Sequence, residues 1–173
     1  MHDVMTTTKR SRTIMWEDPA PTIRAGTALG GLDYLNAIRL GALPAVPSME
    51  LLGMRIAEVQ EGRVVFAADP AEYHYNPMGT VHGGILATLL DSAMGSAVLT
   101  LSPAGTGYTT LEFKVNFVRP VSQETGTVYA EGRVIHRGNR SAIAEGRLTD
   151  SAGTLCAYAV TTCLLVGKPA ASQ

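Results

Sequence analysis

The spacing of hydrophobic residues changes along the chain and predicts two kinds of regular structure. In TTLEFKVNF, residues 109–117, hydrophobic and polar residues alternate, which is typical of a strand with one buried face. Residues 83–101 are mostly apolar on all sides, which predicts a long buried helix. The two faces of the strand would carry Leu111, Phe113, Val115 and Phe117 inside, and Thr110, Glu112, Lys114 and Asn116 outside.

The order of the predicted elements indicates the fold class. Residues 54–70 form two strands around a turn at Glu61-Gly62, and the long helix follows them. Four strands joined by short turns come after the helix, and short turns imply antiparallel neighbours. An antiparallel sheet can cover a helix this apolar only by curling around it, so we expect an α+β fold with one central helix. The last four strands are predicted within residues 109–117, 127–137, 140–150 and 154–166.

The start of the chain has a different pattern. Residues 1–30 are polar, contain prolines and show no steady period, so we expect a loosely attached tail. Residues 32–40 have hydrophobic residues at near-helical spacing and end at a glycine, which predicts a short helix. We therefore divide the chain into an N-terminal extension (1–48), a main domain (49–167) and a C-terminal tail (168–173).

Composition and charge narrow the range of partners. Hydrophobic residues make up 46% of the 173 residues and charged residues 17%, which is enough apolar material for a sizeable core. The formal net charge of −1 gives no long-range attraction for a polyanion, so we expect no nucleic acid partner. No stretch reaches the roughly 20 apolar residues of a membrane span, and the start lacks a secretory signal, so we expect no membrane partner.

The remaining composition argues against metals, cofactors and disulfides. The histidines show no metal-ligand spacing, and no phosphate loop or nucleophile elbow occurs, so neither a metal nor a cofactor is expected. Cys156 and Cys163 lie seven residues apart in one predicted strand, so they would point to opposite faces and stay unpaired. Unpaired cysteines fit a cytoplasmic protein.

Two places in the sequence could carry chemistry. Asp91 lies in the middle of the apolar helix, where a carboxylate is costly to bury unless it is paired or hydrogen-bonded. It could instead face solvent or bind a nearby hydroxyl. His82 and Gly83 open the helix, whose free N–H groups and positive dipole end could stabilise an oxyanion. Without other evidence, Gly83 could serve tight packing, His82 could cap the helix and Asn76 could be an ordinary turn residue.

Taken together, these segments resemble a known family. YNPMGTVHGG (75–84) and LLDSAMG (89–95) closely resemble the hotdog-fold thioesterases, in the group that includes the phenylacetyl-CoA pathway enzymes. The resemblance extends to NFVRP (116–120) and to the hairpin at 136–138, and it covers residues from about 50 to 167. It implies a hotdog fold and hydrolysis of an acyl-CoA with an apolar or aromatic acyl group.

The resemblance also implies roles for individual residues. The Gly83 N–H would polarise the thioester carbonyl, and Asp91 would act as nucleophile or general base. Asn76 and His82 would orient the loop, the thioester and the water, and Thr110 would help to hold that water.

The hairpin tip would bind the substrate at a distance from the carbonyl. Arg137, Gly138 and Arg140 would hold the CoA phosphates. The turn departs from many relatives because its third position is Asn139 instead of arginine, and a solvated hairpin tip is the alternative.

The spacing of two of these residues predicts an oligomer. Gly83 and Asp91 are eight residues apart, which is roughly 12 Å along a helix that rises about 1.5 Å per residue. One helix cannot easily present both to one thioester, so a second copy would supply Asp91. We therefore expect a homodimer or homotetramer, as the family resemblance also implies.

Two other functions are possible on the same fold. A hotdog hydratase acting on an enoyl-CoA would need a catalytic Asp-His pair on a different loop pattern. A non-catalytic acyl-CoA binding or sensing module would have no use for a carboxylate aimed at the carbonyl.

Overall fold

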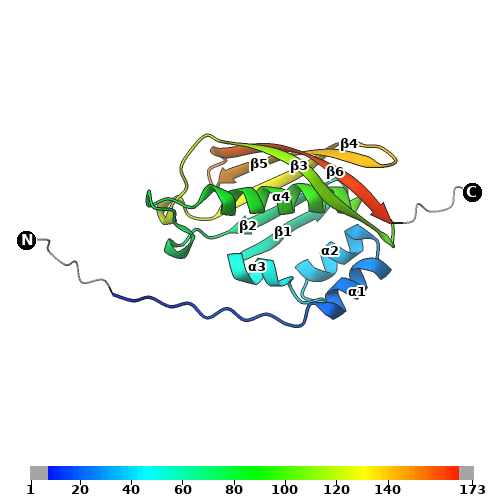
Figure 1. The fold of residues 1–173 in the computed structure, drawn as a ribbon, viewed down its shortest axis with the longest axis horizontal. Helices are drawn as coiled ribbons and strands as arrows, with labels where there is room; N and C mark the ends of the chain where they lie inside the picture. The colour runs from blue at the N-terminus through cyan, green and yellow to red at the C-terminus, as the bar shows by residue number, and fades with distance from the viewer. Residues whose placement is uncertain (1–7, 168–173) are drawn as a thin grey trace, which may run out of the picture.

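The chain folds as a sheet curled around a helix. The computed structural model describes residues 8–167, which contribute six antiparallel strands and a long helix, α4 (Gly83–Thr100), lying across them (Figure 1). Across the sheet the strands are ordered β1-β2-β4-β5-β6-β3. The predicted α+β arrangement is confirmed. The strands are β1 (Met54–Gln60), β2 (Arg63–Ala68), β3 (Thr106–Phe117), β4 (Val128–Arg137), β5 (Ser141–Asp150) and β6 (Leu155–Gly167).

The apolar composition of α4 follows from its burial. The helix is long and apolar enough to cross a membrane, but 56% of it is buried inside the protein, as in the core helix of a soluble domain. Glycines on two strands let the sheet approach it closely. A Cβ on Gly132 would overlap the backbone of Ala93, and one on Gly146 would lie 3.0 Å from the side chains of Leu90 and Met94.

The alternation predicted for β3 is interrupted by a β-bulge. Thr110 pairs with Cys163 and Glu112 pairs with Thr162, so Leu111 is an extra residue in the ladder. The prediction that Leu111 shares the inner face with Phe113 was therefore wrong, and Leu111 is 59% exposed. The bulge places Thr110, which was predicted on the outer face, on the inner face toward α4.

A second bulge corrects the prediction for the cysteines. Between β5 and β6 the register shifts, because Leu148 pairs with Ala157 and Thr149 with Leu155. Cys156 is the extra residue, so both it and Cys163 are buried in the core instead of facing opposite sides of the sheet. Both are free thiols, as predicted.

The start of the chain is more ordered than predicted. The structure forms α1 (Ala20–Ala28), α2 (Gly31–Arg39) and α3 (Pro47–Leu52). The short helix predicted at 32–40 is confirmed as α2, but the prediction of a loosely attached tail was wrong for residues 20–30. Thr22 of α1 is 1% exposed, and Gly31 packs directly on the backbone of α4 at Leu99. Residues 1–7 and 168–173 lie outside the described part of the chain.

Candidate active site

The loop that precedes α4 is held by the side chain of Asn76. Its Oδ1 accepts hydrogen bonds from the N–H groups of Met78 (2.8 Å) and Thr80 (3.3 Å). Its Nδ2 donates to the Thr80 hydroxyl at 3.1 Å, and the Asn76 N–H donates to the Thr80 carbonyl at 2.8 Å. Gly79 completes the turn with φ = 77°, a conformation that favours glycine. Asn76 therefore fixes the shape of the loop from within.

His82 caps the first turn of α4. Its Nδ1 accepts a hydrogen bond from the Gly84 N–H at 2.9 Å, so the proton of the neutral ring is on Nε2. The Gly83 N–H donates to no acceptor within residues 8–167. This free donor lies at the positive end of an 18-residue helix, where it can stabilise an oxyanion.

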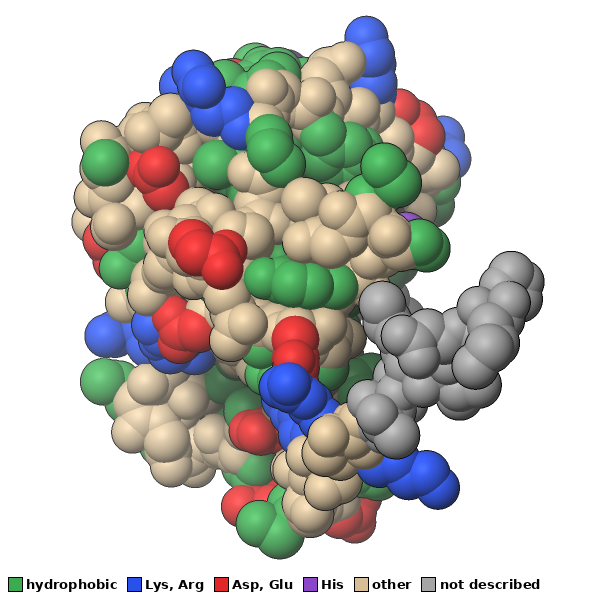
Figure 2. Space-filling view, turned by 90° about the vertical axis from the view of Figure 1, so that its left-hand side faces the viewer, with side chains coloured by type: hydrophobic (Ala, Val, Ile, Leu, Met, Phe, Trp, Pro, Cys, Tyr) green, Lys and Arg blue, Asp and Glu red, His purple; other side chains and the backbone are tan. Residues whose placement is uncertain are grey.

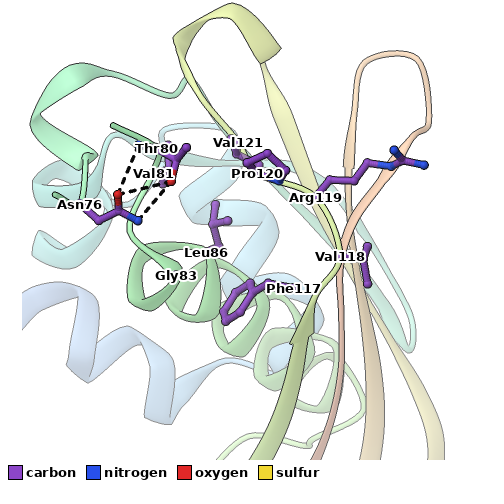
Figure 3. Close-up of a pocket in the computed structure, with 10 residues that line it drawn as sticks. All are labelled: Asn76, Thr80, Val81, Gly83, Leu86, Phe117, Val118, Arg119, Pro120 and Val121. Atoms are coloured by element: carbon purple, nitrogen blue, oxygen red, sulfur yellow. Dashed lines mark hydrogen bonds between the residues drawn. The ribbon is translucent and has the colours of Figure 1, made fainter. Parts of the chain in front are cut away.

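A cavity of about 350 Å³ opens beside Gly83 (Figure 3). The ring of Phe117, at the end of β3, forms one wall, and a Cβ on Gly83 would lie only 3.1 Å from that ring. Glycine at position 83 therefore leaves room for the Phe117 ring against the start of α4. The lining residues are Asn76, Thr80, Val81, Gly83, Leu86, Phe117, Val118, Arg119, Pro120 and Val121.

Asp91 lies further along the same helix and is half-buried. Its Oδ1 accepts a hydrogen bond from the Thr110 hydroxyl at 2.9 Å, whereas Oδ2 accepts none from residues 8–167. The hydroxyl-bound carboxylate was one of the alternatives left by the sequence. Tyr108 packs on Gly95, one turn beyond Asp91. Burial, helped by the charge of Asp91, raises the pKa of Tyr108 well above its ordinary value, so the phenol stays neutral.

The structure gathers the predicted site residues into three groups. Asn76, His82 and Gly83 lie together at the start of α4, and Asp91 lies about two turns away with Thr110, outside the cavity beside Gly83. The hairpin of Arg137, Gly138 and Arg140 lies near the other end of α4.

The hairpin forms a second hollow. Its two arginines line a cavity of about 570 Å³ with Pro103, Thr106 and Leu165. The Gly138 N–H closes the hairpin by donating to the Ser141 carbonyl at 2.9 Å.

Comparisons with known proteins identify the family. A model of the thioesterase superfamily matches residues 78–157. A protein of Saccharolobus solfataricus named as an esterase is 30% identical over 128 residues, which are 74% of this chain and 89% of that protein. This chain belongs to the thioesterase superfamily.

Two further similarities agree with this family. A 1,4-dihydroxy-2-naphthoyl-CoA hydrolase of Listeria monocytogenes is 27% identical over 69% of this chain and 94% of its own length. A structure from Ralstonia eutropha, described as a phenylacetic acid degradation-related thioesterase, is 27% identical with a TM-score of 0.69. It covers 76% of this chain and 98% of its own. The hotdog fold is thus confirmed, and the family supports hydrolysis of thioesters.

Sequence reasoning missed several residues of this candidate site. Phe117 and Leu86 form apolar walls beside Gly83, but periodicity marked them only as core positions. Phe117 is 48% exposed. Its place in the NFVRP segment was the available signal. Tyr108 was also missed, because nothing in the local sequence shows that it packs on Gly95. Within residues 8–167, no three His, Cys, Asp or Glu side chains form a group that could hold a metal ion.

Proposed function

We propose that this protein hydrolyses an acyl-CoA to a free acid and CoA, and that it does so in the cytoplasm. The observation that carries the proposal is the Asp91 carboxylate, oriented by Thr110, on the same helix that presents the free Gly83 N–H. Hydrolysis of a thioester needs little more than a carboxylate near the carbonyl carbon and a hydrogen-bond donor for the carbonyl oxygen. The similarity to a CoA thioester hydrolase supports CoA as the leaving group.

The active site, in this proposal, is shared between two copies of the chain. Gly83 and Asp91 are separated by roughly 12 Å along α4, whereas both must lie about 3 Å from the reacting group. Two antiparallel α4 helices, side by side around a two-fold axis near Ala87, bring Gly83 of one copy to Asp91 of the other. The same two-fold axis generates two equal sites. A homodimer, or a dimer of such dimers, is therefore the working assembly.

This arrangement also suggests how the hairpin that carries Arg137 and Arg140 takes part in substrate binding. Arg137 and Arg140 line a cavity with Pro103, which follows the C-terminal end of α4, so in an antiparallel pair they approach the partner's loop at 75–82. There they can bind the CoA phosphates, with the pantetheine arm running along β3 toward Asp91. The acyl group then occupies the cavity beside the partner's Gly83. Its walls of Leu86, Phe117 and Val121 favour apolar or aromatic acyl groups.

The chemistry has two routes to the same products. In one, Asp91 attacks the carbonyl carbon, the thiolate of CoA leaves, and water opens the resulting anhydride. In the other, Asp91 takes a proton from water as that water attacks the carbonyl. In both, the Gly83 N–H stabilises the oxyanion, and the Thr110 hydroxyl keeps one Asp91 oxygen fixed so that the other faces the substrate.

The test is release of free thiol from a panel of acyl-CoAs, without added metal, by the wild type and by Asp91→Asn. We expect turnover of at least one medium-chain or aromatic substrate. Asp91→Asn keeps the shape of the side chain and removes the base, so its rate should fall about 100-fold or more. Acyl-CoA binding without turnover across the panel would instead show a binding or sensing module.

A further inference from the structure

The N-terminal segment contacts the structure that leads into the active-site loop. Residues 8–18 form no helix or strand and run beneath α3 (Figure 1). Arg10 forms an ion pair with Glu72 at 2.7 Å, in the short 3₁₀ helix η1 (Glu72–His74). Figure 2 views the end of the molecule where α4 begins, and basic and acidic side chains lie next to one another in the lower half of this face.

Arg12 makes three contacts that join α3 to η1. Its guanidinium donates to the carbonyls of Leu51 and Glu50, each at 3.0 Å, at the end of α3. These carbonyls lie in the last turn, where backbone acceptors lack helical partners and a cation is favoured. The same guanidinium stacks 4.1 Å from the ring centroid of Tyr73 in η1. One side chain from the N-terminal segment thus holds two elements together.

From η1 the contacts continue to the first turn of α4. The ring of His74 lies edge-on to Tyr73, with 4.3 Å between centroids, and is almost fully buried. Its Nδ1 accepts a hydrogen bond from the Ala71 N–H at 3.2 Å. The His74 carbonyl accepts a hydrogen bond from the His82 N–H at 2.8 Å, directly before Gly83. A shift of η1 would therefore move the residue that precedes the oxyanion donor.

We propose that Arg12 is a positioning residue, which fixes the loop that presents the Gly83 N–H by clamping α3 to η1. This inference rests on the proposed thioester hydrolysis at that loop. The contacts of Arg12 act through the backbone that presents the Gly83 N–H, so losing them should affect the chemical step more than binding of CoA.

The experiment compares Arg12→Ala with Arg24→Ala, a control that removes an exposed arginine of α1. With the best acyl-CoA, we expect kcat of Arg12→Ala to fall about 5-fold, since small displacements of catalytic groups are costly. KM should change less than about 2-fold. Amide hydrogen exchange should speed up at residues 82–85 and stay constant in β5. Arg12→Lys should restore part of kcat, because an ammonium keeps the contact with the Tyr73 ring.

Two outcomes would overturn or replace the inference, and a third would refute the proposed function instead. Unchanged kcat and loop exchange in Arg12→Ala would show that the clamp does not position the loop, and Tyr73→Leu provides the same test from the other side. A raised KM with normal kcat would mean that the segment acts on substrate binding. If the wild type releases no thiol from any acyl-CoA, the proposed function fails, and the exchange measurement alone decides whether Arg12 holds the loop.

Discussion

Subunit complementation tests the shared site most directly. One chain carries Asp91→Asn and keeps its loop, and the other carries Asn76→Ala and keeps its Asp91. Asn76→Ala removes the side-chain bonds to Met78 and Thr80 that shape the loop, so each parent dimer lacks one essential part in both sites. In a mixed dimer, the intact loop of one chain meets the intact carboxylate of the other.

The expected recovery of activity follows from the separation of the two groups and from the fraction of mixed dimers. Eight residues of helix put Gly83 and Asp91 roughly 12 Å apart, and the short Asp side chain recovers only a few Å of this. Random exchange of equal amounts gives about half mixed dimers, each with one working site of two, so about a quarter of wild-type activity should return. Each parent dimer should keep about 1% of wild-type activity.

The assay is thiol release before and after subunit exchange, with mixed dimers verified by two affinity tags. A control mixture uses Asp91→Asn chains that carry the two different tags, and it should recover nothing. If verified mixed dimers remain as inactive as their parents, one chain must contain the whole site, and the antiparallel pairing of α4 helices would be wrong.

Three other predictions address single features. Thr110→Val removes the 2.9 Å hydrogen bond to the Asp91 carboxylate and should lower kcat about 10- to 100-fold, whereas the exposed neighbour Thr109→Val should not. The Arg137→Ala, Arg140→Ala double variant should raise KM for acyl-CoA more than it lowers kcat, and an unchanged KM would leave the hairpin a solvated tip. Burial, with help from a nearby arginine, lowers the pKa of His74 below its ordinary value near 6.5. The folded state therefore takes up its proton later than the unfolded state, and stability should be lost as pH falls below about 6.5. Urea unfolding at neutral and acidic pH measures this loss, which should shrink in His74→Phe.

The strongest periodic signals predicted the fold correctly. The apolar run of α4 and the turn at Glu61-Gly62 are local features, because residues close together in the sequence determine helix burial and hairpin geometry. The loop residues from Asn76 to Gly83 were also found together, since they are adjacent in sequence.

Features that depend on distant contacts could not be predicted. The bulge at Leu111 carries no glycine or proline, and the alternation there looks regular, so only the pairing with β6 reveals the shift that turns Thr110 inward. Helix α1 has one large apolar residue, Ile23, which is exposed, whereas Thr22 is buried by tertiary contacts. The hairpin at Arg137 was recognised from the sequence. Which end of α4 it lies beside could not be predicted, because that depends on the direction of the helix across the sheet.

The buried helix α4 has a consequence during synthesis. Strands β1 and β2 precede it in the chain, but β4 and β5, whose Gly132 and Gly146 receive it, come later. At about 5–20 residues per second, a ribosome needs several seconds to make the strands after Thr100. During that interval only β1 and β2 are available to cover a segment as apolar as a membrane span. The nascent chain therefore exposes apolar surface of α4 until β4, β5 and β6 are made, and a chain stopped before β4 should aggregate.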